Sequence, residues 1–120
     1  QEFEVIFYAK ENGEEPAKEF LMSLDEKMRA KIVRAISRLE RNGIELREPF
    51  SKHLEDGIFE LRASFSSNVS RVLYFFFTGR IAVLTNGFIK KTQKTPRTEI
   101  EKAKRYRDDY IARENKNDGN

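Results

Sequence analysis

The chain has 120 residues and a formal net charge of +3, with 23 Lys and Arg against 20 Asp and Glu. This length predicts one domain. Cysteine is absent, which excludes disulfides and thiolate metal sites and is compatible with the reducing cytoplasm, where we expect the protein to be located. No apolar run approaches the roughly 18 residues that a membrane span needs, so we expect no contact with a membrane.

The N-terminal segment predicts a strand followed by a short helix. Residues 3–9 are rich in β-branched and aromatic side chains, which favour an extended conformation. The stretch that follows contains Gly13 and ends the strand. Pro16 suits the first turn of a helix, because its missing N–H would have no partner there, and we expect this helix to continue to Leu21.

A second, longer helix is predicted next. Ser23 and Glu26 have the spacing of a capping box, which would begin the helix. Apolar residues then recur at helical spacing; they are Leu24, Met28, Ile32, Ala35, Ile36 and Leu39. Gly43 is a suitable residue to end the helix.

From residue 58 the pattern changes to that of strands. Residues 58–64 alternate, with Phe59, Leu61 and Ala63 on one face and Glu60, Arg62 and Ser64 on the other. Residues 69–77 are almost continuously apolar, as in a central strand that is buried on both faces. A turn at 78–80 leads into a further apolar strand. Residues 58–89 therefore predict a three-stranded antiparallel meander.

The C-terminal region predicts one more helix. Thr95 and Pro96 have the character of an N-cap and a first-turn proline, and an apolar stripe at helical spacing follows. We expect the domain to span residues 1–114 and residues 115–120 to form a disordered tail. The predicted fold class is α+β: an N-terminal strand, a helical hairpin, an antiparallel three-stranded meander and a C-terminal helix.

Positive charge is concentrated between residues 62 and 97. This stretch has seven cations and no acid; they are Arg62, Arg71, Arg80, Lys90, Lys91, Lys94 and Arg97. Acids close to a phosphate-binding groove would repel its ligand, so their absence predicts a surface for a polyanion. The alternative is that strands simply disfavour acids.

Other site chemistries have little support in the sequence. His53 is the sole histidine, and there is no cysteine and no Gly-x-Ser-x-Gly elbow to indicate nucleophilic catalysis. The carboxylates are scattered over predicted helix faces, where solvated ion pairs are the simpler interpretation. No glycine-rich phosphate loop is present. We therefore expect neither a metal nor a cofactor.

The basic residues around the predicted start of the last helix favour an anion, because backbone N–H groups point out of a helix at that end. Arg62 and Arg71 would grip a phosphate between them if they project from neighbouring strands onto the same face. Lys90 and Lys91 are adjacent in a strand, so at most one of them lines a given cleft. The alternative for each cation is an ordinary place on the surface.

The chain resembles a known family over residues 52–107. The motifs that carry the resemblance are GIFELR, RVLY, GFIKKTQKTP and EIEKA. Together they resemble the RelE/ParE superfamily of toxin–antitoxin toxins, and more narrowly its phage-derived HigB-like branch. The strand and helical hairpin predicted upstream agree with that family's order of elements.

The resemblance implies an endoribonuclease that cleaves messenger RNA on the ribosome. In such enzymes the 2′-hydroxyl of the RNA attacks the neighbouring phosphate without a metal. The resemblance also implies neutralisation by an antitoxin, commonly a helix-turn-helix protein. Two alternatives remain open: a ParE-like inhibitor of DNA gyrase without RNase activity, and an RNA-binding domain that cleaves nothing.

The motif positions imply roles for individual residues. Catalytic roles fall on Arg62, Arg71, Lys90 and Lys91, and RNA-binding roles on Lys52, His53, Tyr74, Phe88, Lys94 and Arg97. Tyr74 and Phe88 would stack on bases, or else belong to the core. Several relatives have a tyrosine where this chain has Glu101, so the general base and acid are not assigned. The helical hairpin, with Met22, Leu24, Met28 and Ile32, offers a docking face for the antitoxin, or else packs in the core.

Overall fold

The computed structural model describes residues 3–90 and 94–118. The elements within these residues follow one another as β1 (Glu4–Phe7), α1 (Pro16–Ser23), α2 (Glu26–Asn42), a 3-10 turn (Gly43–Glu45), β2 (Ser51–Glu55), β3 (Ile58–Phe65), β4 (Asn68–Phe77), β5 (Ile81–Lys90) and α3 (Arg97–Asp118). The predicted α+β class and the order of its elements are confirmed. No helix in the described part of the chain has the length and apolar character to cross a membrane.

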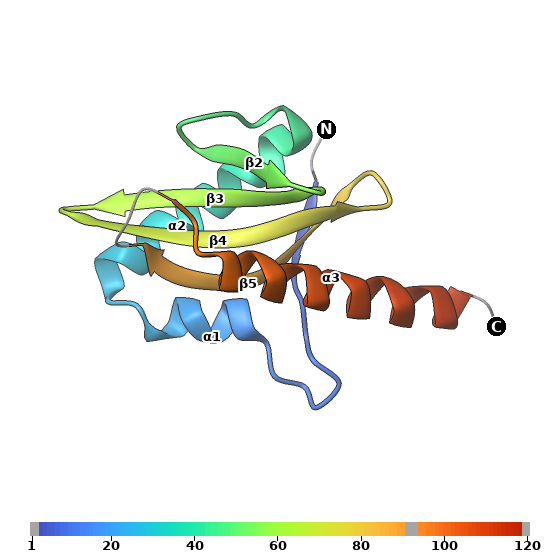
Figure 1. Cartoon of the computed structure of the whole chain (residues 1–120). Coiled ribbons are helices and arrows are strands. Elements are labelled where there is room, and N and C mark those ends of the chain that lie inside the picture. Colours follow the sequence, from blue (N-terminus) through green and yellow to red (C-terminus); the bar gives the residue numbers. More distant parts are fainter. Residues whose placement is uncertain (1–2, 91–93, 119–120) are drawn as a thin grey trace.

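The strands form a single sheet in the order β1-β5-β4-β3-β2 (Figure 1). The predicted meander of β3, β4 and β5 is confirmed and occupies the centre of the sheet. β1 pairs in parallel with β5, and β2 pairs antiparallel with β3. The sequence did not predict β2, because its five residues, SKHLE, are mostly polar and lack the alternation that marks a half-buried strand.

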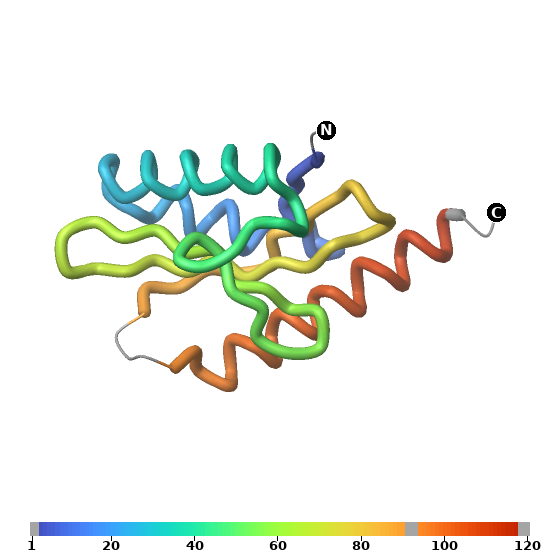
Figure 2. Tube along the Cα trace, turned by 90° about the horizontal axis from the view of Figure 1, so that it is seen from above, coloured from blue at the N-terminus to red at the C-terminus, as the bar shows by residue number. Residues whose placement is uncertain are grey.

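The helices cover both faces of the sheet. α1 and α2 lie on one face and α3 crosses the other (Figure 2). Each face has its own apolar cluster: one under α1 and α2, which contains Leu21, Met28, Ile32 and Leu39, and one under α3, which contains Ala103. Alternate residues of β3 and β4 therefore pack against different helices.

The helical hairpin follows the prediction except at the junction between its helices. Asp25, not Ser23, caps α2, and its side chain accepts a hydrogen bond from the backbone N–H of Met28 at 2.9 Å. The Ser23 hydroxyl instead donates to the carbonyl of Phe20 within α1. The predicted capping box is therefore wrong, because α1 continues to Ser23. Gly43 ends α2 as expected, with φ = 54°.

The start of α3 also differs from its prediction. The helix begins at Arg97, and the Pro96 carbonyl accepts the N–H groups of Glu99 and Ile100. Because the Pro96 carbonyl accepts the first helical bond, the N-cap position falls on Pro96 and not on Thr95. The Thr95 hydroxyl donates to a carboxylate of the sheet, that of Glu60. The helix continues through Asp118 and so includes four of the residues expected in the tail.

Candidate anion-binding pocket

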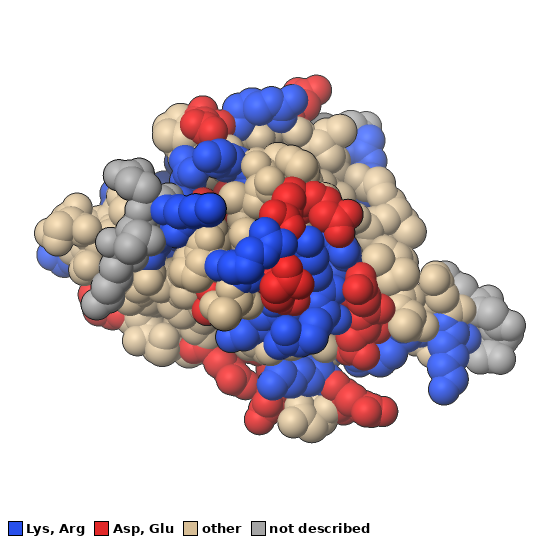
Figure 3. Space-filling model, viewed as in Figure 1, with Lys and Arg blue, Asp and Glu red and all other residues tan. Residues whose placement is uncertain are grey.

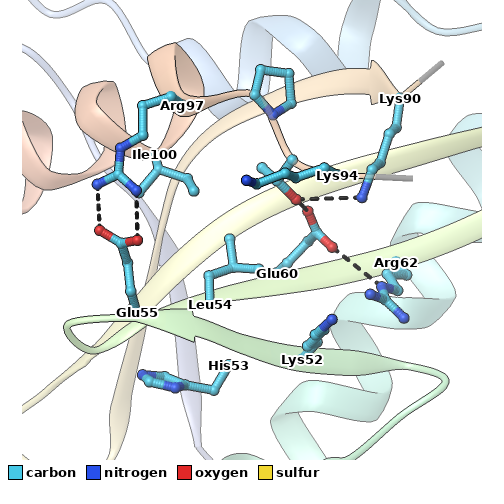
Figure 4. Close-up of a pocket in the computed structure, with 12 residues that line it drawn as sticks. Lys52, His53, Leu54, Glu55, Glu60, Arg62, Lys90, Lys94, Arg97 and Ile100 are labelled. Carbon is cyan, nitrogen blue, oxygen red and sulfur yellow. Dashed lines mark hydrogen bonds and ion pairs between the residues drawn. The ribbon is translucent and has the colours of Figure 1, made fainter. Parts of the chain in front are cut away.

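A pocket of about 650 Å³ lies between β2, β3 and the start of α3 (Figure 4). It opens on the face of the sheet that α3 partly covers. Its lining residues come from β2, β3, β5 and the α3 N-terminal region; they are Lys52, His53, Leu54, Glu55, Glu60, Arg62, Lys90, Lys94, Thr95, Pro96, Arg97 and Ile100. Six of the ten residues for which the sequence predicts a site role are among them.

Strand register brings the pocket's basic residues together. Lys52 lies opposite Glu60 across β2 and β3, and Arg62 lies opposite Arg71 across β3 and β4. Side chains that are directly opposite share a face of the sheet. Glu60 and Arg62 are two residues apart in one strand and so share that face too. The sheet itself therefore gathers one acid and several cations on the side of α3.

Glu60 is at the centre of the site, and its side chain is completely buried. Its carboxylate accepts hydrogen bonds from Arg62 Nε at 3.2 Å, from Arg71 Nη1 and from the Thr95 hydroxyl. Burial raises the pKa of Glu60, but the bond from Thr95 and the charges of Arg71 and Lys90 outweigh it, and the pKa lies below its usual value. Glu60 is therefore a buried anion that ties three segments together.

Lys90 is held beside this anion. It is only 9% exposed, and its Nζ donates to the Thr95 hydroxyl at 3.4 Å. Burial lowers the pKa of Lys90, the positive charges of Arg71, Arg62 and Lys52 lower it further, and the charge of Glu60 opposes them. The ammonium group thus loses its proton more readily than that of an ordinary lysine.

Arg62 and Arg71, predicted as a phosphate-gripping pair, are placed differently. Both contact Glu60, but only Arg62 lines the pocket. The Arg71 side chain is 11% exposed and is packed against the carboxylate. Arg71 therefore balances the buried charge of Glu60, and of these two arginines Arg62 is the one that faces the cavity. Lys91, the remaining predicted catalytic residue, lies outside the described residues.

The rim of the pocket has a second group of charges around Arg97. Its guanidinium donates to both oxygens of Glu55, with 2.6 Å between Nη1 and Oε1, and to Glu101 at 2.7 Å. Lys104 also donates to Glu55 at 2.6 Å. The hydrogen bonds that Arg97 and Lys104 donate to Glu55 lower the pKa of this carboxyl to about 2. Arg97 is therefore already engaged by two carboxylates, whereas the sequence placed it on the ligand.

The aromatic residues predicted to stack on bases do not reach the pocket. Tyr74 is 1% exposed, bonds to the Ser51 hydroxyl at 2.5 Å and stacks on Phe59 in the cluster under α1 and α2. Its ring is on the opposite face of the sheet from the pocket. Phe88 is partly buried and packs against the cluster under α3. The structure therefore supports the core alternative for both rings.

His53 lies at the edge of the pocket with its ring turned away from the cavity (Figure 4). It is opposite Phe59 in the sheet, and the two rings are 5.0 Å apart. Its Nε2 accepts the N–H of Gly57 at 3.2 Å. A ring nitrogen that already accepts a backbone hydrogen bond is poorly placed to remove a proton from a ligand. This geometry is unfavourable to His53 as a general base.

The absence of acids between residues 62 and 97 does not extend to the whole pocket. Two carboxylates, Glu55 and Glu60, line the pocket. The acid-free stretch begins at Arg62, two residues after Glu60, so the count along the chain missed an acid that the strand places on the same face. The period of two in β3 was the signal that could have revealed it. The role of Thr95 had no such signal, because only the tertiary fold brings it to Glu60.

The remaining cations, Lys52, Arg62, Lys90 and Lys94, surround the cavity as potential phosphate ligands. Arginine and lysine recognise phosphate by charge-assisted hydrogen bonds, and such bonds strengthen where water is partly excluded. Among residues 3–90 and 94–118, no group of three or more His, Cys, Asp or Glu side chains could hold a metal ion.

Comparison with known protein families identifies a match over most of the chain. Residues 19–108 match the model of a family described as phage-derived protein Gp49-like (DUF891). The match includes α2, the whole meander and the first half of α3, and so includes every residue that lines the pocket. No curated protein matches the chain.

Proposed function

Because the chain belongs to the Gp49-like family of phage-derived proteins, which is a RelE/ParE-type toxin family, we propose that it is the toxin of a type II toxin–antitoxin module. We place it in the HigB-like branch and assign it cleavage of messenger RNA on the ribosome. The observation that carries this proposal is the convergence of Lys52, Arg62, Lys90 and Lys94 on one cavity. A cavity of this charge fits a phosphodiester of the RNA backbone.

The proposed reaction is an internal phosphoryl transfer. The 2′-oxygen of the RNA forms a bond to the neighbouring phosphorus, and the bond from phosphorus to the 5′-oxygen breaks. The 2′-hydroxyl gives up its proton, and the 5′-oxygen gains one. The products are a 2′,3′-cyclic phosphate and a free 5′-hydroxyl. The protein has to orient the attack and stabilise the extra negative charge on the phosphorane.

Arg62 and Lys90 are the residues best placed for the charge. Arg62 contacts Glu60 through Nε, and a guanidinium has two further nitrogens with which to grip phosphate oxygens. Lys90 is a second donor and, given its lowered pKa, a candidate for the proton transfer. Lys52 and Lys94, on opposite sides of the cavity (Figure 4), would hold the flanking backbone.

The proposal is tested with Arg62→Ala and Lys90→Ala. Loss of one donor to a developing oxyanion typically slows catalysis by about 10²–10³-fold. Cells in which either variant is induced are therefore expected to keep growing, whereas the wild-type protein arrests growth. Lys18→Ala removes a lysine from α1, outside the pocket, and serves as the control. Circular dichroism establishes that each variant is folded. Undiminished toxicity of both folded pocket variants would contradict the proposal.

The chemistry is tested by mapping ends. New transcript ends that carry a 2′,3′-cyclic phosphate are expected within minutes of induction of the wild-type protein. DNA breaks without new transcript ends would instead identify a ParE-like gyrase inhibitor. Salt-sensitive RNA binding without either product would identify a binding domain.

The proposed antitoxin is a helix-turn-helix protein that forms a tight complex with this chain. Its docking face does not consist of the hairpin residues that the sequence indicated, since Leu24, Met28 and Ile32 are buried and only Met22, 63% exposed, is available. The test is co-expression with the product of the adjacent open reading frame. Separate elution of the two proteins in size-exclusion chromatography would contradict the proposal.

A further inference from the structure

A stripe of basic side chains runs along α2, on the far side of the sheet from the pocket. Its five members follow one another at intervals of four, three, four and three residues, which places them along one side of the helix; they are Lys27, Lys31, Arg34, Arg38 and Arg41. We call this set the α2 stripe. At 1.5 Å per residue it is about 21 Å long.

Most of the stripe is exposed, and no carboxylate is paired with it in the part of the chain that the structure describes. Lys27, Lys31, Arg34 and Arg41 are exposed, and Arg38 is half-buried. Within the described part of the chain, none of the five forms an ion pair with a carboxylate. The acids of α2, Glu26 and Glu40, lie roughly 100° or more around the helix from the centre of the stripe, at 100° per residue.

Two aromatic contacts fix where the stripe lies. The Lys27 ammonium is 5.7 Å from the centre of the Phe65 ring, at the end of β3, and the Arg38 guanidinium is 4.0 Å from that of Phe50, just before β2. The stripe is therefore on the flank of α2 that borders β2 and β3. Lys52 of the pocket belongs to the same β2 strand, so one edge of the sheet separates the two basic regions.

We propose that the α2 stripe is a second RNA-binding surface, which holds the phosphate backbone of a structured RNA while a single strand occupies the pocket. The inference rests on the proposed function and adds to it the surface by which a folded RNA is engaged. A length of about 21 Å corresponds to about six phosphates of one strand at ~3.4 Å each. The five cations are about 5 Å apart along the helix axis, so each can lie beside a phosphate of such a strand.

The stripe fits RNA better than it fits an acidic protein segment. Protein interfaces depend on an apolar core with a few buried anchors, and polar residues form the rim. The five stripe positions are all cations, and Arg38 already stacks on a ring of its own chain. A phosphate backbone requires only evenly spaced positive charge. A contact of that kind carries a strong dependence on salt, which makes it measurable.

The experiment compares two variants of equal net charge. One neutralises four stripe residues (K27Q/K31Q/R34Q/R41Q) and keeps Arg38, which packs on Phe50. The matched control neutralises four cations elsewhere (K10Q/K18Q/K102Q/R105Q). The probe is a 20-base-pair RNA duplex, and its affinity for the full chain is measured across a series of salt concentrations.

Each phosphate contact contributes roughly 0.7–0.9 to the slope of log affinity against log salt, so the stripe variant is expected to reduce the slope by about three. The control is expected to change it by less than one. Equal slopes for the two variants would overturn the proposal, as would an unchanged slope for the stripe variant. Loss of antitoxin binding with RNA binding retained would also overturn it and would assign the stripe to a protein partner.

RNA cleavage and the salt dependence of RNA binding test the pocket and the α2 stripe separately. Arg62→Ala is expected to abolish cleavage but to reduce the slope by no more than about one, since it removes a single phosphate contact. If Arg62→Ala cleaves normally while the stripe variant shows the reduced salt dependence, the catalytic proposal is contradicted and the proposed RNA surface is supported. If it loses cleavage while the stripe variant binds like wild type, the stripe proposal falls alone.

Discussion

The two long helices, α2 and α3, are both rich in cations but use them differently. α2 has six Lys and Arg and two acids, and α3 has seven Lys and Arg and six acids. Five cations of α3 form ion pairs: Arg97, Lys102, Lys104, Arg107 and Arg113. The five cations of the α2 stripe form none among the described residues. Most cations of α3 are thus paired within the fold, whereas those of the α2 stripe have no carboxylate partner in the described part of the chain.

The way each helix is attached to the sheet follows the same division. α2 packs through apolar side chains, with Ile32 and Leu39 completely buried. α3 adds polar contacts at several points along its length, such as Glu99 with Asn86 and Asp109 with Tyr8. Figure 3 shows basic and acidic side chains interleaved over the region where α3 lies. The comparison predicts that charge substitutions destabilise the α3 side and leave the α2 side stable.

The largest effect is expected from Glu60→Ala. The substitution removes the carboxylate that holds Arg71 and Thr95 and leaves a buried arginine without its counter-charge, which typically costs about 3–5 kcal/mol. Urea denaturation measures the free energy of unfolding. Glu55→Ala is the control, since this carboxylate is on the exposed rim and its removal should cost far less. Equal losses for the two variants would show that the α3 side does not depend on the buried charge of Glu60.

Glu60 should also make stability depend on pH. Its pKa is below the ordinary value of 4.5 in the folded state, so its contribution is present above that value and is lost as the pH falls through the lower, folded pKa. Urea denaturation of the wild-type protein between pH 6 and pH 3 is expected to show this loss. Glu60→Gln should have a flatter profile, because no proton is taken up at this position. An identical profile for the two proteins would show that other carboxylates dominate.

On the α2 side, a comparable loss of stability is expected from the substitution of an apolar residue. Leu39→Ala removes a completely buried side chain and leaves a cavity, at an expected cost of about 3 kcal/mol. The measurement is again urea denaturation at neutral pH. A cost below that of a polar substitution on the α3 side, such as the next one, would contradict the view that α2 is attached by apolar contacts.

A smaller loss of stability is expected from a substitution where the C-terminal half of α3 meets the residues just after β1. The Tyr8 hydroxyl donates to Asp109 at 2.6 Å, and the Tyr8 ring stacks on Tyr106. Tyr8→Phe keeps the stacking and removes the hydrogen bond to a charged partner, which is worth about 1.5–3 kcal/mol. Thermal unfolding monitored by circular dichroism would detect it. An unchanged midpoint would mean that the bond contributes nothing.

The smallest effect is expected from single neutralisations within the α2 stripe. Replacement of Lys31 or Arg34 by Gln should change stability by no more than about 0.5 kcal/mol, because both are exposed and neither forms an ion pair among the described residues. The same denaturation assay applies. A loss above 1 kcal/mol would show that the stripe serves the fold, and the division between the two helices would fail.

Much of the fold was predictable because the signals that begin and end its helices and strands are local in the sequence. Pro16 and Gly43 mark helix ends, and the alternation from Phe59 onward marks a strand. The edge strand β2 was not predictable, because this polar segment becomes a strand only by pairing with the edge of β3. The parallel pairing of β1 with β5 joins segments almost eighty residues apart, and no local pattern specifies it.

The candidate site was predictable in composition and not in arrangement. The sequence identified Arg62, Lys90 and Lys94 as a basic group, and the structure places them around one cavity. It did not identify the central carboxylate, although the alternation of β3 places Glu60 on the same face as Arg62. The pairing of Arg62 with Arg71 and the approach of Thr95 depend on the tertiary fold, and no local pattern shows them. Tyr74 was a different kind of miss: it is three residues from Arg71 in one strand, so alternation alone places it on the other face.

The bond between Thr95 and Glu60 has a consequence for the order in which the molecule is assembled. The two residues are 35 positions apart, and the later one precedes the last helix of the chain. While the protein is being synthesised, the sheet can therefore form with both arginines gathered on the acid before the hydroxyl arrives to close the cavity. A nascent chain that ends before Thr95 has the charges of the site without its finished shape.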